Sequence, residues 1–218
     1  MGRKSLGQGI LDLDGGRGMS LTGSVASGRA DRDSWAGWER PRSTPLHEVP
    51  LARLSCNRHG TPWRIADADW CETAGEKIAR SGFNFLVERM EGEMRDLREP
   101  SGVEGFSIAH SGKGMTWGCI LVWEDATDLP VAGQRQGTPY VRPEYRGRGL
   151  AAQVQLRAFD TGLKTVDDGV FFSAGGLAAR RAAHRLAVER AVKQGVEVSE
   201  EVLADYPHLQ VNAPTPGM

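Results

Sequence analysis

The sequence has no long hydrophobic run, almost no net charge and few cysteines. No stretch approaches the roughly 18 consecutive apolar residues of a membrane-spanning helix, so we expect no membrane association. A formal net charge of −1 gives no bulk attraction toward nucleic acid or anionic lipid. Three cysteines, an odd number, argue against a disulfide framework, and residues 1–10 lack the apolar core of a signal peptide. These features favour a cytoplasmic protein with free thiols.

The sequence also lacks internal repeats, a Walker motif, a dinucleotide-binding fingerprint and a nucleophile elbow. Its 218 residues, 39% of them hydrophobic, suffice for one domain with a proper core. Residues 1–49 are rich in Gly, Ser, Arg, Asp and Pro, which predicts a disordered or loosely attached arm, apart from Trp35 and Trp38, which could dock on the domain or on a partner. We expect the folded domain over residues 50–212 and a flexible tail over 213–218.

The first half of the domain predicts two helices and then a hairpin. Asp67 or Asp69 can cap a helix, and the Ser81-Gly82 pair interrupts the helical spacing before it resumes and closes at residues 99–102. Residues 106–108 and 115–123 alternate between apolar and small or polar side chains, which is typical of strands. Residues 124–130 then end the hairpin, and a loop through Gly133 and Gly137 leads to a strand over 138–142.

Residues 140–151 carry the strongest functional signal. Tyr140 and Val141 favour a strand that stops by Pro143, two glycines follow, and a helical pattern begins at Leu150. A strand, a glycine-rich turn and a helix start place several backbone N–H groups at the positive end of a helix dipole. Such a turn suits an anion, best a phosphate, and Arg146 and Arg148 add positive charge beside it.

The second half continues with a short apolar run, Val170-Phe171-Phe172, which predicts a buried parallel strand. A long Ala-rich helix then runs to about Gln194 and ends at Gly195. Its second face is basic and holds Arg180, Arg181, Arg185, Arg190 and Lys193. Nucleic-acid or partner binding through this face is one alternative function, although Glu189 interrupts it and charge runs of this kind are usually solvated.

The motif resembles the coenzyme A motif of the GNAT (GCN5-related N-acetyltransferase) family. The resemblance rests on Val141-x-Pro143-Glu144-Tyr145-Arg146-Gly147-Arg148-Gly149-Leu150-Ala151, with Arg146-x-x-Gly149-x-Ala151 at its centre. It implies a mixed α/β (α+β) fold with a mainly antiparallel central sheet flanked by helices. It also implies that the strands before and after the motif helix run parallel, adjacent and splayed at the CoA site. The cofactor-binding residues would be Tyr140, Val141, Arg142, Arg146, Gly147, Arg148, Gly149, Leu150 and Ala151.

The resemblance weakens at the C-terminus. The family's last two strands have only weak candidates, over 196–198 and 209–212, and the helix from Ala178 to Lys193 lacks the tyrosine that commonly protonates the leaving thiolate. Tyr206 is then the one late candidate for the acid. Glu124 and Asp125, at the end of the central strand, are the first candidates for the base, ahead of His110 on the hairpin surface.

The function implied is transfer of an acetyl group from acetyl-CoA to an amine by direct attack. Backbone N–H groups around Tyr140 to Arg142 would serve as oxyanion donors by resemblance. We expect a small-molecule or peptide amine as the acceptor and no specific nucleic-acid partner, although the sequence also leaves an aminoacyl-tRNA open. The oligomeric state stays open, a homodimer included. The first alternative is a non-catalytic acyl-CoA-binding or interaction module on the same fold. We expect no metal, since Cys56, His59 and Cys71 supply only three ligands at usable spacing.

Overall fold

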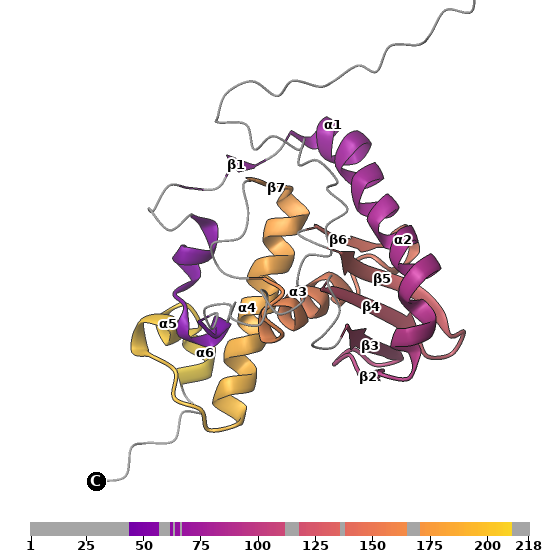
Figure 1. Ribbon diagram of the computed structural model, residues 1–218. Helices are drawn as coiled ribbons and strands as arrows, with labels where there is room; N and C mark the ends of the chain where they lie inside the picture. Colours follow the sequence, from indigo (N-terminus) through magenta and orange to yellow (C-terminus); the bar gives the residue numbers. More distant parts are fainter. Residues whose placement is uncertain are drawn as a thin grey trace, which may run out of the picture. The chain divides into compact units, whose positions relative to one another are not determined.

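The computed structural model describes residues 44–56, 62, 64–65, 67–111, 118–135, 138–164 and 171–210. The chain divides into two units, Met1–Glu39 and Arg40–Met218, and all described residues belong to the second. Its elements (Figure 1) are η2 Leu46–Glu48, η3 Leu51–Ser55, β1 Arg64–Ile65, α1 Ala68–Trp70, the π-helical turn η4 Cys71–Gly75, α2 Glu76–Arg95, β2 Glu99–Pro100, β3 Phe106–His110, β4 Cys119–Glu124, β5 Leu129–Arg135, β6 Thr138–Val141, η5 Pro143–Tyr145, α3 Leu150–Asp160, β7 Phe171–Phe172, α4 Ala174–Lys193, α5 Glu200–Ala204 and α6 Pro207–Gln210. No helix among the described residues is long and apolar enough to cross a membrane.

Five strands form an antiparallel sheet in the order β2-β3-β4-β5-β6. Successive side chains of a strand point to opposite faces, so β4 supplies two cores. Leu121 and Trp123 pack with Phe83 and Leu86 of α2, whereas Ile120 and Val122 pack with Leu150 and Val154 of α3. One helix therefore covers each face of the sheet (Figure 1). The expectation of a mixed fold with a mainly antiparallel sheet flanked by helices is confirmed.

The helical region before the sheet is continuous, which corrects the expected break at Ser81-Gly82. Asp67 caps its start by accepting hydrogen bonds from the backbone N–H groups of Asp69 and Trp70, and α2 runs through Gly82 to Arg95. A glycine inside a helix costs only about 1 kcal/mol. Burial of Phe83 and of two further α2 side chains, Leu86 and Met94, offsets that cost.

The loop expected through Gly133 is instead part of strand β5, the neighbour of both β4 and β6, while Gly137 lies outside the described residues. The ladder shifts from the pair Val122 and Ala132 to the pair Trp123 and Pro130, so Pro130 lies beside a bulge, where a strand tolerates proline. Gly133 is needed for close packing, because a Cβ there would lie 2.7 Å from the Ile120 carbonyl oxygen. Both residues suggest a loop in the sequence, yet both suit this strand.

The parallel pairing expected between the strands before and after the motif helix is not found. Residues 171–172 form β7, which pairs in parallel with β1, in the register Arg64 to Phe171 and Ile65 to Phe172. In the part of the chain that the structure describes, β6 pairs with β5 alone. A strand of two residues carries almost no side-chain pattern, so its sequence does not specify its partner. Val170 lies outside the described residues.

The buried core includes residues that precede Pro50. Leu46 and Val49, assigned from sequence to the N-terminal arm, are buried with Leu156 of α3 and Ala183 of α4. The folded domain therefore begins before Pro50. Trp35 and Trp38 lie outside the described residues.

The C-terminal strand candidates are also corrected. Residues 196–198 form no strand, and the first two residues of the candidate over 209–212 lie within helix α6, while residues 211 and 212 lie outside the described residues. Val202 of α5 and Tyr206 pack on Val188 of α4, so a helical segment and not a pair of strands packs on α4 here.

Candidate functional site

The glycine-rich turn has the geometry that the sequence predicts. Strand β6 ends at Val141, the turn η5 follows, and helix α3 begins at Leu150 with Gly149 as its N-cap residue. Gly147 and Gly149 have φ angles of +80° and +84°. Side chains other than glycine rarely adopt this left-handed conformation, so both positions favour glycine. The glycines let the chain reverse tightly between the strand and the helix.

The turn exposes a series of backbone donors. The N–H groups of Ala152 and Gln153 both donate to the Gly149 carbonyl oxygen. None of the N–H groups from Gly147 to Ala151 donates to a residue that the structure describes, and no side chain caps Gly149. These are the orphan donors of a helix start together with those of the preceding turn. They offer a cluster of partial positive charge with which an anion can pair.

The two arginines of the turn are held differently. Arg146 donates from Nε to the Val141 carbonyl oxygen at 3.2 Å and pairs through Nη2 with Glu76 of α2 at 3.0 Å. Arg148 instead lies over the rings of Tyr145 and Phe106, with its Cζ 5.1 and 5.9 Å from their centroids. Arg146 thus connects the turn to α2, while Arg148 rests on the aromatic side chains beside β3.

Strand β6 offers one open donor where sequence analysis expected several. The Arg142 N–H donates to the Val131 carbonyl oxygen at 2.9 Å, and the two-residue alternation of a strand turns the Tyr140 N–H toward β5 as well. The Val141 N–H points the other way, to an edge with no strand partner among the described residues. Of the three expected oxyanion donors, Val141 is therefore the one available.

Tyr140 does not face α3, because its side chain is buried on the opposite face of the sheet. Its ring packs on Phe83 with centroids 5.1 Å apart. Val141, the next residue, packs against the core below α3. Leu150 is fully buried in that same core and anchors the start of the helix, whereas Ala151 is only partly buried. Tyr140 and Leu150 therefore support the turn from the two faces of the sheet.

Glu124, the first candidate base, is tied to the turn by hydrogen bonds. Its Oε2 accepts from the Thr127 hydroxyl at 2.7 Å and from the Tyr145 hydroxyl at 3.0 Å. These bonds, with the charge of Arg148 nearby, hold the pKa of Glu124 below its ordinary value of 4.5. A carboxylate with a lowered pKa is a weak base at neutral pH. Asp125 is exposed, and its backbone N–H donates to the Gly105 carbonyl oxygen.

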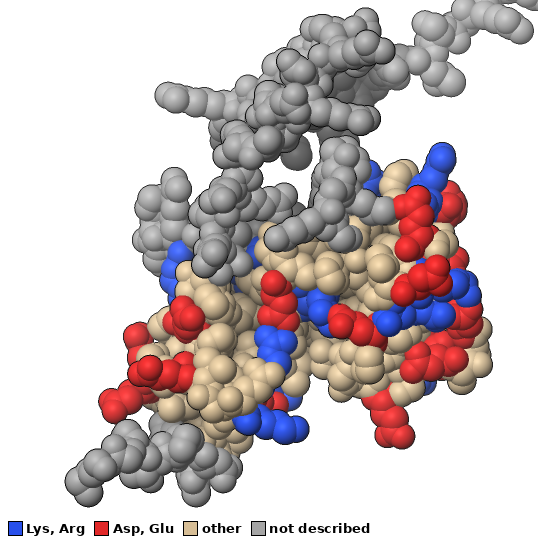
Figure 2. Space-filling model, turned by 60° about the horizontal axis from the view of Figure 1, so that its bottom comes forward, with Lys and Arg blue, Asp and Glu red and all other residues tan. Residues whose placement is uncertain are grey.

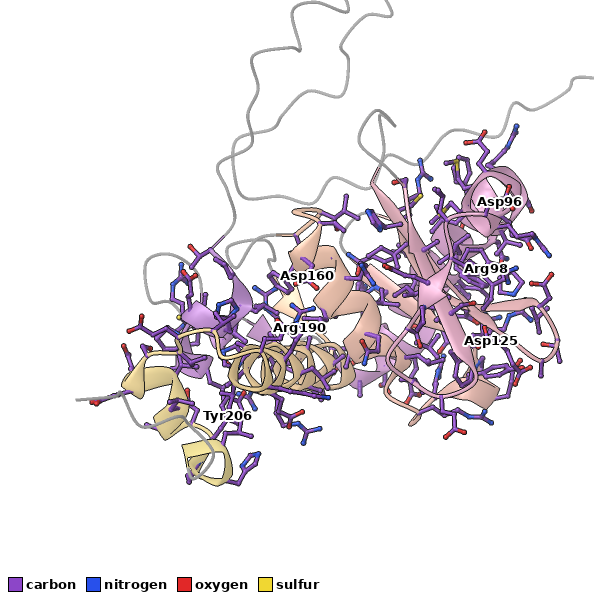
Figure 3. All side chains as sticks on the ribbon, turned by 90° about the horizontal axis from the view of Figure 1, so that it is seen from below. Asp96, Arg98, Asp125, Asp160, Arg190 and Tyr206 are labelled. Carbon is purple, nitrogen blue, oxygen red and sulfur yellow. The ribbon has the colours of Figure 1, made fainter. Side chains whose placement is uncertain are left out.

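Tyr206, the candidate acid, is placed elsewhere in the fold. It is buried against α4, and its hydroxyl lies 2.6 Å from Nδ1 of His184. Burial is the main cause that raises the pKa of Tyr206 to about 12. Figure 3 shows Tyr206 among the C-terminal elements, well away from Asp125 at the sheet. The turn and Tyr206 are therefore not brought together, and Tyr206 lies outside this site.

Sequence reasoning missed two residues that the fold brings to the turn, Glu76 and Arg80. Both lie in the first turns of α2, and Arg80 donates to Glu76 Oε1 at 2.8 Å. Their spacing of four residues signals an ordinary pair on one helix face. Nothing local in the sequence links that pair to Arg146, which lies 70 positions after Glu76 in the chain.

The basic face expected on α4 is interrupted. Arg180 is fully buried, with its Cζ 5.1 Å from the centre of the Phe159 ring. Arg190 donates to both carboxylate oxygens of Asp160 at 2.7 Å (Figure 3), and Arg185 pairs with Glu189 at 3.5 Å. Figure 2 shows acidic and basic side chains interspersed on this side of the molecule. A continuous positive surface for nucleic acid is not formed along these residues.

A cleft of about 460 Å³ lies between α3, α4 and the loop before β3. Ile108, Leu156 and Leu186 supply apolar lining, while the Arg190–Asp160 ion pair lines it with charge. The cleft is open to solvent and does not include the residues of the turn. None of the turn residues 146–151 lines this cleft, so it is separate from the candidate site.

Among the described residues, no three His, Cys, Asp or Glu side chains are grouped so that they could hold a metal ion. His59 lies outside these residues, and Cys56 and Cys71 are partly exposed free thiols.

Comparisons with protein-family models, with curated proteins and with solved structures found no match for this chain. The likeness to the GNAT family therefore rests on the sequence motif of residues 141–151.

Proposed function

We propose that this chain is an acyl-CoA-dependent N-acetyltransferase that moves an acetyl group from acetyl-CoA to an amine. The observation that carries the proposal is the turn between β6 and α3. Its left-handed glycines, Gly147 and Gly149, present backbone N–H groups that have no acceptor among the described residues. A diphosphate carries the charge and the acceptor oxygens that such a cluster needs. The residues present fit coenzyme A.

The binding residues divide between the turn and the strand before it. Backbone N–H groups from Gly147 to Ala151, with the guanidinium groups of Arg146 and Arg148, would hold the phosphates. One edge of β6 has no strand partner among the described residues. This edge suits an extended, amide-containing arm, because strand edges bind such groups through main-chain hydrogen bonds. Val141 would supply the N–H that binds the carbonyl oxygen of the acyl group. When bound, acetyl-CoA supplies the activated thioester.

Catalysis in this proposal rests on positioning and on backbone donors. Holding an amine against a bound thioester supplies much of the rate, since proximity can contribute several kcal/mol. The N–H of Val141 stabilises negative charge on the acyl oxygen, which is the role of an oxyanion donor. Glu124, with its lowered pKa, contributes little as a base. The amine therefore has to reach the site in its neutral form or lose its proton to water. Its attack on the acyl carbon would form the amide as the C–S bond breaks, and the released CoA thiolate would take its proton from water.

The second candidate is a non-catalytic acyl-CoA-binding or interaction module on the same fold. One observation favours it: the single late tyrosine, Tyr206, is buried and bonded to His184. The two candidates share cofactor binding and differ in turnover. A small-molecule or peptide amine is the acceptor in the first candidate only. For either, we propose a cytoplasmic location, where thiols such as those of Cys56 and Cys71 stay reduced.

Two measurements test the proposal. Calorimetry with CoA at low salt should show binding, and Arg146→Ala should weaken it by about 1–3 kcal/mol if this guanidinium pairs with phosphate. Absence of heat at millimolar CoA would reject both candidates. Release of free thiol from acetyl-CoA across a panel of amines then separates the two, because a binding module gives no turnover with any amine.

A further inference from the structure

One carboxylate oxygen receives two arginines beside the turn. Oε1 of Glu76 lies 2.8 Å from Nη2 of Arg80 and 3.0 Å from Nη2 of Arg146. Arg80 lies one helical turn after Glu76, while Arg146 comes from the turn between β6 and α3. The Glu76 side chain is 23% exposed, against 53% and 49% for the two arginines. The anion is thus the more enclosed member of the cluster.

The cluster has one positive charge more than its single carboxylate can neutralise. Each guanidinium carries five N–H donors, and Glu76 occupies one from each. Arg146 uses a second donor on the Val141 carbonyl oxygen, and Arg80 also has a side-chain hydrogen bond with Tyr140. Phosphate oxygens accept from guanidinium groups with the same geometry as carboxylate oxygens. The position between the two guanidinium groups therefore suits a phosphate oxygen, and the Glu76 carboxylate occupies that position.

We propose that Glu76 is an internal counter-ion which a phosphate group of the ligand replaces, and that Arg80 is a phosphate-binding residue alongside Arg146. This inference rests on the proposed function, because it takes the turn to be the phosphate site. Without a ligand, Glu76 holds the two guanidinium groups together. With a ligand, the carboxylate competes for them, so it lowers the affinity for every anion bound there. Removing its charge should therefore tighten binding.

The test is calorimetric titration with inorganic pyrophosphate and with CoA at low salt. Glu76→Gln keeps the shape of the side chain and removes its charge, and we expect it to bind both probes about threefold to tenfold more tightly. Glu72→Gln is the matched control: Glu72 is exposed one turn earlier, carries the same charge and has no ion pair recorded with a described residue. It should stay within about twofold of the unchanged protein. Arg80→Gln should weaken both probes about threefold to tenfold.

The outcomes separate this inference from the proposed function. If the unchanged protein binds CoA and Glu76→Gln binds it equally or more weakly, Glu76 is no competitor and the inference is wrong, while the proposed function stands. If neither protein binds CoA, both are wrong. A gain that persists undiminished in 1 M salt would also contradict the inference, because competition between charges is screened there. Circular dichroism and thermal melting of each variant confirm that the fold is intact.

Discussion

The hydroxyl of Tyr206 and Nδ1 of His184 lie 2.6 Å apart, both buried where the C-terminal residues pack on α4. The other ring nitrogen of His184 lies 2.6 Å from the Val49 carbonyl oxygen. A neutral ring satisfies both contacts, with Nε2 donating to the carbonyl and Nδ1 accepting from the tyrosine. The pair thus joins three distant segments of the chain and leaves Tyr206 no free proton for chemistry.

This pair predicts a pH-dependent stability. Burial lowers the pKa of His184 below its ordinary value of 6.5, against the opposing effect of the bond to Val49. The folded protein therefore takes up the proton less readily than the unfolded chain. The contribution of His184 to the free energy of unfolding is therefore fully present above pH 6.5, and it is lost as the pH falls below that value. Urea unfolding at a series of pH values should show this fall, and His184→Gln should flatten it, whereas the exposed His208→Gln should not.

Tyr206 should contribute to the stability of the fold and not to catalysis. Tyr206→Phe should lower the free energy of unfolding by about 1–2 kcal/mol, because it removes a buried hydrogen bond. CoA affinity and acetyl transfer by the folded variant should stay near those of the unchanged protein. A loss of turnover with unchanged stability would instead restore Tyr206 as the acid.

Replacing glycine with alanine should have opposite effects on stability at Gly133 of β5 and at Gly82 of α2. A Cβ at Gly133 would lie 2.7 Å from the Ile120 carbonyl oxygen and 3.2 Å from the Phe83 ring, so Gly133→Ala should destabilise by about 1–3 kcal/mol. A Cβ at Gly82 has no neighbour within 4 Å, so Gly82→Ala in α2 should stabilise by about 0.5–1 kcal/mol. Thermal melting of the two variants checks both signs. If both variants melted at the same temperature, the close packing of Gly133 against Ile120 and Phe83 would be contradicted.

Local features of the sequence predict the turn well. Its features are close together in the sequence: two strand formers, then two glycines, then a helical spacing from Leu150. The conformation of the turn therefore depends on neighbouring residues and not on distant partners. The cap at Asp67 and the end of α4 before Gly195 are confirmed for the same reason.

Features that depend on distant partners could not be predicted. Pro130 and Gly133 indicate a loop until the bulge of β4 and the approach of Phe83 are known. The burial of Tyr206 depends on His184 and Val49, and the partner of β7 is β1, more than a hundred residues earlier in the chain. Arg146 meets Glu76 only once α2 packs beside β6.

The N-cap position predicts a selective loss of binding. Gly149 has a φ of +84°, and a Cβ there would meet only Val103 at 3.9 Å, so the cost of Gly149→Ala is backbone strain of about 1–2 kcal/mol. Gly149→Pro also removes one N–H and cannot adopt this φ, so we expect it to abolish CoA binding. Gly92→Ala, inside α2 with no atom near its Cβ, is the control and should bind CoA normally. If a folded Gly149→Pro variant bound CoA normally, the turn would not be the phosphate site.

Glu124 gives the sharpest test of catalysis by positioning. Its hydrogen bonds to Thr127 and Tyr145 lower its pKa, so it is already ionised at neutral pH and has little tendency to take a proton from an amine. The Gln side chain can still accept from both hydroxyl groups, so Glu124→Gln should preserve the turn. We expect kcat/KM for acetyl transfer to fall by less than about tenfold, well short of the 10²–10⁴-fold typical of a lost general base. Steady-state rates across pH should keep the same profile in the variant, because any ascending limb would report the amine and not Glu124. A fall beyond about a hundredfold, with the limb displaced, would make Glu124 the base and would show that proximity and the Val141 donor are insufficient.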